Sequence, residues 1–306
     1  SHGNYNTPYF KAQWLLTGQP SKGAGGGRGK GSKLPNLGEY EKFCSEAASH
    51  YKDKIVYWES WNEPGVKMAE DEYLPLLKAF YSGIKKGNPN AKVLGLTGTW
   101  DAEGDLYGWV KKCLKLGAGS YMDIIAIHGY HVLDRDYVAQ VKQTAKSITG
   151  KDWEIWDTEA GTILYDPYGF PPYFKYAPVE KYNFEKNIEF MLRLLLNEMA
   201  CGASRQSWYN LDSSYSWMGS PEYSRISHDG TPDISLIAYN ALIENFHNAK
   251  FVKSLNLSGQ TVAYLFKRGD ELVLAYWNEI LQTKGKVKLQ EGESIESALR
   301  RFKRKV

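Results

Sequence analysis

The chain has few cysteines, no long apolar run and almost no excess charge, and each scarcity excludes a class of protein. Its three cysteines, Cys44, Cys113 and Cys201, are odd in number, lie far apart and each fall inside a helical pattern. A disulfide framework is therefore not expected, and buried free thiols are the default for such residues. No cluster of cysteine and histidine has the spacing of a zinc site, so we predict neither a metal nor another cofactor.

Membrane and nucleic-acid partners are disfavoured on similar grounds. No run approaches the roughly 18 apolar residues that a bilayer span needs, and the N-terminus lacks an apolar signal segment. Ser1-His2 resembles a cloning scar, which leaves the localisation open and includes secretion with a leader removed. The net charge is +3, and its excess gathers in residues 300–305, a short basic run that is typical of a solvated chain end.

Two aromatic-rich tracts that end in glutamate stand out against this background. The first is Tyr57-Trp58-Glu59-Ser60-Trp61-Asn62-Glu63-Pro64, and the second is Trp153-Glu154-Ile155-Trp156-Asp157-Thr158-Glu159. A pair of carboxyl groups suffices to cleave a glycosidic bond, because one protonates the leaving oxygen while the other attacks the anomeric carbon or activates water. Either tract alone could equally be a surface glutamate at a strand end, so the hypothesis depends on the presence of both.

Around these tracts, strand-like and helix-like stretches alternate, which is typical of a parallel sheet wrapped by helices. Apolar runs predict buried strands at residues 55–61, 92–96, 122–128, 153–156 and 204–211. Helical spacing of apolar positions predicts helices at residues 39–51, 71–86, 106–116, 135–148 and 178–200. Short alternating strands at residues 261–267, 272–277 and 284–289 indicate a small β-sandwich. We therefore predict two domains, residues 1–248 and residues 249–306.

Four segments resemble one clan of enzymes. Trp61-Asn62-Glu63-Pro64 resembles the fourth-strand signature of the clan A retaining glycoside hydrolases, which are built on a (β/α)8 barrel, and Thr158-Glu159 resembles the nucleophile of their seventh strand. Residues 124–130 are similar to the sixth strand and residues 206–210 to the eighth. With a glycine-rich loop after Thr7-Pro8 and a C-terminal sheet, the chain is most similar to family 39, with family 5 as a neighbour.

The resemblance implies a retaining β-glycoside hydrolase that cleaves β-linked oligo- or polysaccharides by double displacement, with Glu63 as acid/base and Glu159 as nucleophile. It also implies substrate-binding roles, which include a contact of Asn62 with the sugar 2-hydroxyl, a bond from Tyr130 to the nucleophile and a sugar platform. The residues expected to bind substrate are Asn62, His128, Tyr130, Trp208 and Trp100. The expected partner is a carbohydrate.

Alternation along the two glutamate tracts separates other residues from the site. Barrel enzymes work at the C-terminal ends of their strands, which selects Glu63 and Glu159. We expect Glu59 and Asp157, which are deeper in the barrel, to be buried structural partners. The same alternation predicts that Trp58 and Trp156 face the surrounding helices.

The strand count predicts a (β/α)8-type barrel that is N-terminally incomplete. If Glu63 closes strand four, the predicted strands are strands four to eight, with a remnant of strand three at residues 4–9. Open edges at residues 55–61 and 204–211 would expose apolar faces, and a homo-oligomer, a swapped copy or an N-terminal fragment would complete the barrel. The alternative function is that of a catalytically impaired or truncated barrel that binds carbohydrate without cleaving it.

Overall fold

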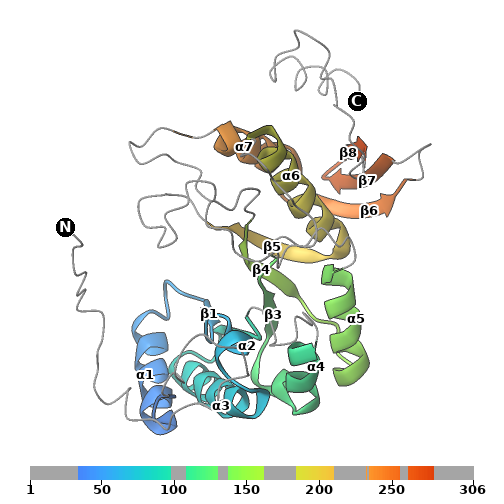
Figure 1. Ribbon diagram of the computed structural model, residues 1–306. Coiled ribbons are helices and arrows are strands. Elements are labelled where there is room, and N and C mark those ends of the chain that lie inside the picture. The colour runs from blue at the N-terminus through green and yellow to red at the C-terminus, as the bar shows by residue number, and fades with distance from the viewer. Residues whose placement is uncertain are drawn as a thin grey trace, which may run out of the picture. The chain divides into compact units, whose positions relative to one another are not determined.

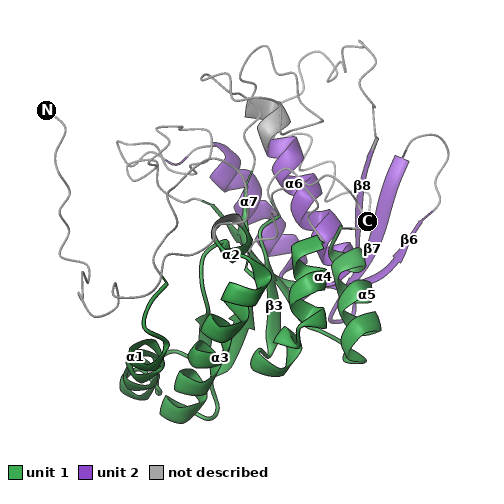
Figure 2. Ribbon diagram, turned by 60° about the horizontal axis from the view of Figure 1, so that its bottom comes forward, with its two compact units in different colours: residues 1–162, 203–209 green, residues 163–202, 210–306 purple. Residues whose placement is uncertain are grey.

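The computed structural model describes residues 34–97, 108–129, 137–161, 184–209, 232, 234–255 and 261–278. The chain forms two compact units, one made of residues 1–162 and 203–209 and the other of residues 163–202 and 210–306 (Figure 2). The division into domains at residue 248 stays a prediction. Within the described residues, no helix combines the length and the apolar character that crossing a membrane requires.

The first unit contains a parallel sheet of five strands in the order β1-β2-β3-β4-β5, which is also their order in the chain (Figure 1). The strands are β1 (Tyr57–Glu59), β2 (Lys92–Gly95), β3 (Ile124–Ile127), β4 (Ile155–Ala160) and β5 (Ala203–Trp208). The connecting elements are α1 (Leu37–His50), α2 (Pro64–Lys67), α3 (Glu70–Gly87), α4 (Gly108–Lys115), the 3-10 helix η2 (Ala118–Tyr121) and α5 (Tyr137–Thr149). All five predicted strands are therefore confirmed.

Helices α1 and α3 pack closely because glycines in α3 leave room for the neighbouring helix. A Cβ atom added at Gly83 would collide with the carbonyl oxygen of Glu41 and would lie 2.7 Å from Cβ of Cys44. The start of α1 is fixed by Asn36, whose side chain accepts hydrogen bonds from the backbone N–H groups of Gly38 at 3.0 Å and Glu39 at 3.2 Å. Helices α1 and α3 thus form a tightly packed layer beside the β1 edge of the sheet.

The sheet is curled, and side chains of its two edge strands meet over its concave face. Tyr57 of β1 lies with its ring centroid 4.5 Å from that of Trp156 on β4. The guanidinium carbon of Arg205, on β5, lies 4.3 Å from the Trp156 ring and 4.8 Å from the Tyr57 ring. Strands at opposite edges can approach in this way only if the sheet bends toward closure. The five strands thus form part of a (β/α) barrel, which confirms the predicted fold class.

The pairing register of the strands corrects one expectation about the aromatic residues. Trp156 was expected to face the helices, but it lies on the concave face, where it forms a buried cluster with Leu94, Ile124 and Ala126. Residues paired in register on parallel strands share a face, and Ala126 pairs with Trp156. Trp58 pairs with Val93 and lies on the opposite face, as expected.

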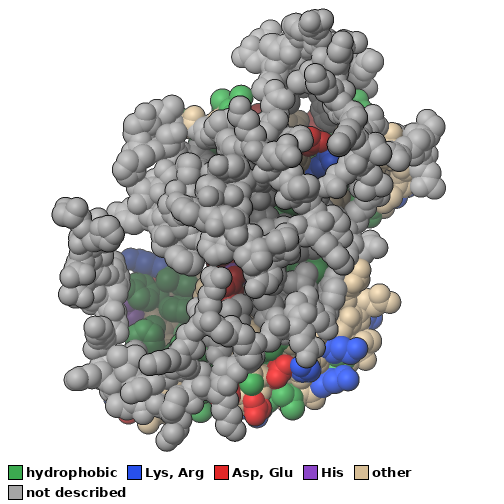
Figure 3. Space-filling view, viewed as in Figure 1, with side chains coloured by type: hydrophobic (Ala, Val, Ile, Leu, Met, Phe, Trp, Pro, Cys, Tyr) green, Lys and Arg blue, Asp and Glu red, His purple; other side chains and the backbone are tan. Residues whose placement is uncertain are grey.

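The two edges of the sheet differ in polarity. At the β1 edge, Ile55, Val56 and Tyr57 are each more than a third exposed, and Figure 3 shows hydrophobic side chains gathered over the α1 and β1 part of this unit. At the β5 edge the exposed side chains are polar, namely Ser204, Arg205 and Ser207. The expectation of exposed apolar faces is therefore confirmed for β1 and wrong for β5.

The second unit contains two helices and a small antiparallel sheet. Its elements are α6 (Phe184–Cys201), α7 (Ile234–Phe246), β6 (Lys250–Ser254), β7 (Thr261–Arg268) and β8 (Glu271–Asn278), with strand order β6-β7-β8. Gly269, with a φ of 58°, forms the predicted turn between β7 and β8. The buried Phe246 and Phe266 make an edge-to-face contact in its core, and the more exposed Phe251 packs against Phe266. The predicted strand at residues 284–289 lies outside the described residues.

Candidate active site

Glu63 lies just beyond the carboxyl end of β1, at the start of α2. Strand β1 ends at Glu59, and Glu63 is the N-cap of α2 with φ 47° and ψ 56°, a left-handed conformation that is costly for a residue with a Cβ atom. Pro64 follows at the first helical position, where its fixed φ suits the helix. The strand alternation that was expected to align Glu63 with Glu59 therefore does not reach Glu63, although its position at the end of the strand is as predicted.

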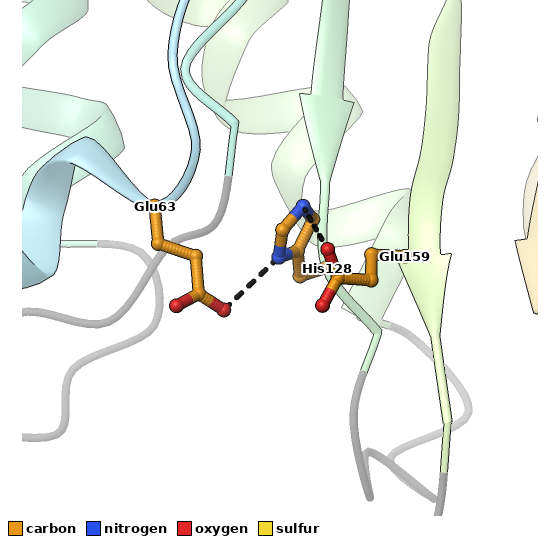
Figure 4. Close-up of side chains that lie close together, drawn as sticks. All are labelled: Glu63, His128 and Glu159. Atoms are coloured by element: carbon orange, nitrogen blue, oxygen red, sulfur yellow. Dashed lines mark hydrogen bonds and ion pairs between the residues drawn. The ribbon is translucent and has the colours of Figure 1, made fainter. Parts of the chain in front are cut away.

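His128 directly follows β3 and is the most deeply buried member of the site, with 2% of its side chain exposed. Its Nδ1 lies 3.0 Å from Oε1 of Glu63, and its Nε2 lies 3.8 Å from Oε2 of Glu159. The first distance is that of a hydrogen bond and the second that of an ion pair without one. The imidazole ring thus lies between the two glutamates (Figure 4).

Glu159 lies near the end of β4, in a segment where the pairing with β5 shifts register between Asp157 and Ala160. Such an irregularity re-aims side chains at the rim of a sheet. The fully buried Asp157 fixes the backbone here, because its Oδ1 accepts hydrogen bonds from the backbone N–H groups of Glu159 at 3.1 Å and Gly129 at 3.2 Å. Asp157 is buried and structural, as predicted, and its bonds join the ends of β3 and β4. It lies on the face opposite to Trp156, however, and not deeper in the barrel as expected.

The side chains of Glu63, His128 and Glu159 form one compact group. One oxygen of each glutamate and one ring nitrogen of the histidine all lie within 4.8 Å of one another. Both glutamates are partly open to solvent, at 27% and 28% exposure. Two ionised carboxylates at such a distance would repel each other by about 3 kcal/mol at an effective dielectric constant of about 20. A proton on one member of the group relieves this repulsion.

The pKa of His128 is raised above its ordinary value by its neighbours. Burial works in the other direction, because it disfavours the charged imidazolium. The hydrogen bond to Glu63, together with the negative charges of Glu159, Glu63 and Asp157, outweighs that effect. The histidine therefore keeps its proton to a higher pH than an isolated imidazole would.

Glu59 departs from the prediction made for it. It was expected to be buried, but its side chain is exposed on the concave face of the sheet. Its Oε1 accepts two hydrogen bonds, one from the hydroxyl of Thr97 at 2.9 Å and one from the hydroxyl of Thr158 at 2.7 Å. No pattern in the sequence indicates Thr97 as part of this arrangement, whereas Thr158 directly precedes Glu159 and could have been suspected for that reason.

The other predicted substrate-binding residues fall into two groups. Asn62 is exposed beside Glu63, and Trp208 is half-buried on β5, where it pairs with Ala160 immediately after Glu159. Tyr130 and Trp100 lie outside the described residues. Within the described residues, the structure thus brings Glu63, His128 and Glu159 together and places Asn62 and Trp208 next to them in the chain or the sheet.

The same three side chains offer the ligand types that borderline divalent cations use, which are imidazole nitrogen and carboxylate oxygen. Their position at the carboxyl ends of parallel strands is where barrel enzymes carry out their chemistry. The sequence-based expectation of no metal and no cofactor stays a prediction.

Solved structures of similar fold belong to glycoside hydrolases, while no family model and no curated protein matches the chain. A family 39 glycoside hydrolase from the gut symbiont Bacteroides cellulosilyticus WH2 has a TM-score of 0.60 at 20% identity, over 81% of this chain and 53% of that one. A family 39 β-xylosidase from Caulobacter crescentus gives 0.56 at 19% identity, over 78% and 53%. A glucosidase from Croceicoccus marinus gives 0.55 at 14% identity, over 83% and 56%.

The fold is that of a barrel of the type found in these glycoside hydrolases. The chain has the barrel fold of the clan A glycoside hydrolases, and its solved neighbours include members of family 39. The chain spans about half the length of these neighbours. Because fold does not by itself imply function, the activity has to be argued from the site.

Proposed function

We propose that this chain carries the catalytic pair of a retaining β-glycoside hydrolase, with Glu159 as the nucleophile and Glu63 as the acid/base. The observation that supports this most directly is the approach of the two carboxyl groups, with one oxygen of each within 4.8 Å of the other. Retaining enzymes hold their carboxyl groups about 5–5.5 Å apart, whereas inverting enzymes need about 6.5–9.5 Å to accommodate a water molecule. The short separation favours direct attack on the sugar.

In the first step, a carboxylate oxygen of Glu159 attacks the anomeric carbon as the bond to the glycosidic oxygen breaks. Glu63 donates its proton to that oxygen, so the leaving group departs as a neutral alcohol and a covalent glycosyl-enzyme forms. In the second step, ionised Glu63 takes a proton from water, whose oxygen attacks the anomeric carbon and releases Glu159. The sugar leaves with its original β configuration after two inversions.

His128 supplies a way to store the acid proton between turnovers. Protonated Glu63 beside neutral His128 has the same net charge as ionised Glu63 beside an imidazolium. The proton can therefore move across the 3.0 Å contact between Oε1 and Nδ1 without changing the charge of the site. In the state ready for reaction, neutral His128 carries its hydrogen on Nε2, the ring nitrogen that lies 3.8 Å from Glu159.

The sugar itself would be held by residues around the pair. Asn62 is proposed to contact the 2-hydroxyl, Tyr130 to bond Glu159, and Trp208 and Trp100 to contact the sugar ring, with carbohydrate as the partner and no cofactor required. Two of the solved neighbours are named as a β-xylosidase and a glucosidase. Aryl β-xylosides and aryl β-glucosides are therefore the first substrates to test.

A second function, carbohydrate binding without cleavage, is favoured by one observation. Tyr57 and Glu59 are exposed on the concave face below the site. Water that reaches this face would weaken the electrostatic interactions on which catalysis depends. This alternative predicts sugar binding that both glutamates support, with no turnover of any aryl glycoside.

A series of leaving groups tests the proposed roles. Glu159→Ala should abolish turnover of every substrate, because no nucleophile remains. Glu63→Ala should lose activity toward poor leaving groups but retain much of it toward dinitrophenyl glycosides, which leave without protonation. Equal loss in Glu63→Ala for all leaving groups would contradict the acid role, and circular dichroism would establish that both variants are folded.

A further inference from the structure

The two catalytic glutamates are carried by strands that are not neighbours in the sheet. Glu63 follows β1 and Glu159 lies on β4, with β2 and β3 between them. Three strand spacings of about 4.8 Å each would separate β1 and β4 by about 14 Å in a flat sheet. The distance between the two carboxyl groups therefore depends on how tightly the sheet curls. Backbone pairing alone does not set this curvature, because the twist between neighbouring strands can vary.

One hydrogen bond spans the concave face between these two strands. The hydroxyl of Thr158 on β4 donates to Oε1 of Glu59 on β1 at 2.7 Å. Thr158 directly precedes Glu159 in the chain, and Glu59 ends the strand that leads to Glu63. A hydroxyl bonded to a carboxylate at this distance forms a strong, charge-assisted contact. The same hydroxyl lies 3.5 Å from the carbonyl oxygen of Ile127, which is the weaker of its two acceptors.

We propose that Glu59 and Thr158 form a cross-strand tie that holds the ends of β1 and β4 together and thereby sets the separation of Glu63 and Glu159. Glu59 is then a positioning residue, acting through the strand rather than on the substrate. Its catalytic consequence rests on the proposed function, whereas the tie itself is a statement about geometry. The tie complements Asp157, which joins the ends of β3 and β4 through backbone N–H groups.

Thr97 provides the natural control for this proposal. Its hydroxyl donates to the same Glu59 oxygen at 2.9 Å, but it follows β2, which is already paired with β1 along the backbone. Loss of the Thr97 bond should leave the distance between β1 and β4 unchanged. If Glu59 only stabilised the fold, loss of either threonine hydroxyl would have the same effect. If it forms the tie, only loss of the Thr158 hydroxyl changes the separation of Glu63 and Glu159.

His128 is a reporter of the separation, because its two ring nitrogens face the two glutamates at 3.0 and 3.8 Å. If β1 and β4 move apart, the imidazolium loses part of its stabilisation by Glu63, whereas Glu159 and Asp157 stay near it because both lie on β4, which is paired with β3. The pKa of His128 should then fall toward its ordinary value. NMR titration of the ring measures this without any substrate, and the signal can be assigned by comparison with a His128→Asn variant.

The test uses three threonine variants of the chain. In Thr158→Val, which removes the hydroxyl and keeps the shape, the pKa of His128 should fall, and kcat for aryl β-glycosides should drop by up to about 10²-fold, with KM nearly unchanged. Thr158→Ser restores the hydroxyl and should recover both values. Thr97→Val should leave the His128 titration as in the wild type. If Thr158→Val does not fold, Thr158→Ala removes the same hydroxyl without changing any charge and must show the same fall in pKa.

The outcomes separate the tie from the proposed function. A folded Thr158→Val variant with an unchanged His128 titration overturns the tie, whatever its activity. A fall that Thr97→Val produces equally would also overturn it, because the effect would then follow from general loosening. A fall specific to Thr158→Val in a protein that cleaves no glycoside would support the tie and contradict the proposed function instead.

Discussion

Replacing Asp157 tests whether one buried carboxylate holds the backbone of the candidate active site in place through its hydrogen bonds. This side chain is fully buried, and its Oδ1 accepts the backbone N–H groups of Glu159 and Gly129. Asp157→Ala would leave two buried donors without this acceptor, whereas Asp157→Asn keeps an acceptor oxygen in place and removes only the charge. The two variants thus separate hydrogen bonding from electrostatics at one position.

The expected magnitudes follow from the two bonds. Hydrogen bonds to a charged group contribute about 1.5–3 kcal/mol each, so Asp157→Ala should lower the free energy of unfolding by about 3–6 kcal/mol. Asp157→Asn should cost about 2 kcal/mol at most, because neutral hydrogen bonds remain and a buried charge is removed. Against a total stability of about 5–15 kcal/mol, the alanine variant should be close to unfolding.

Urea unfolding gives the stabilities, and NMR titration of His128 gives the electrostatic effect. The charge of Asp157 helps to raise the pKa of His128, so Asp157→Asn should lower that pKa. The matched control is Asp123→Asn, because Asp123 also accepts a backbone N–H group, that of Val93 at 2.8 Å, but precedes β3 at its opposite end. The reasoning is refuted if Asp157→Ala costs less than about 1 kcal/mol, or if the control lowers the pKa of His128 as much as Asp157→Asn does.

Three further predictions concern stability. Gly83→Ala should destabilise the protein by about 1–3 kcal/mol in urea unfolding, because the new Cβ meets the carbonyl oxygen of Glu41, and a gain in stability would contradict the close packing of α1 and α3. Because the pKa of His128 is raised on folding, the protonated ring contributes fully to the free energy of unfolding below about pH 6.5. This contribution is lost as the pH rises through the folded-state pKa, so the free energy of unfolding should decline less with pH in His128→Asn than in the wild type. Arg205→Lys should cost about 1 kcal/mol in the same assay because the planar guanidinium stacks on Trp156 and lysine cannot, and no loss would show that the stack is not stabilising.

The strands and the positions of both glutamates could be predicted because each depends on local pattern. The run Ile124–Ile127 is buried at every position, as a central strand of a parallel sheet must be, and continuous apolar character is visible in the sequence. The short tract before Glu159 combines aromatic and β-branched residues and forms β4. Position at the carboxyl ends of such strands then follows from the rule for barrels.

The remaining features depend on three-dimensional relationships that pattern does not encode. Strand β1 ends at Glu59, and the left-handed conformation of Glu63 breaks the alternation that was extended to it. Trp156 faces inward because the register shift between Asp157 and Ala160 breaks the alternation that was counted back from Glu159. Helix α7 was missed because apolar residues are spread around its circumference, so no one-sided helical spacing marks it. The Glu59–Thr158 bond joins residues 99 positions apart in the sequence.

The measurement that tests the central claim most directly is mass spectrometry of the intact protein after incubation with 2,4-dinitrophenyl 2-deoxy-2-fluoro-β-glycosides of xylose and glucose. The fluorine slows both steps, and the activated leaving group keeps the first fast enough for the glycosyl-enzyme to accumulate. The account predicts one added sugar, located on Glu159 by peptide mapping, and none in Glu159→Gln. An unlabelled wild-type protein that nevertheless hydrolyses the parent glycosides, or a label on another residue, would contradict it.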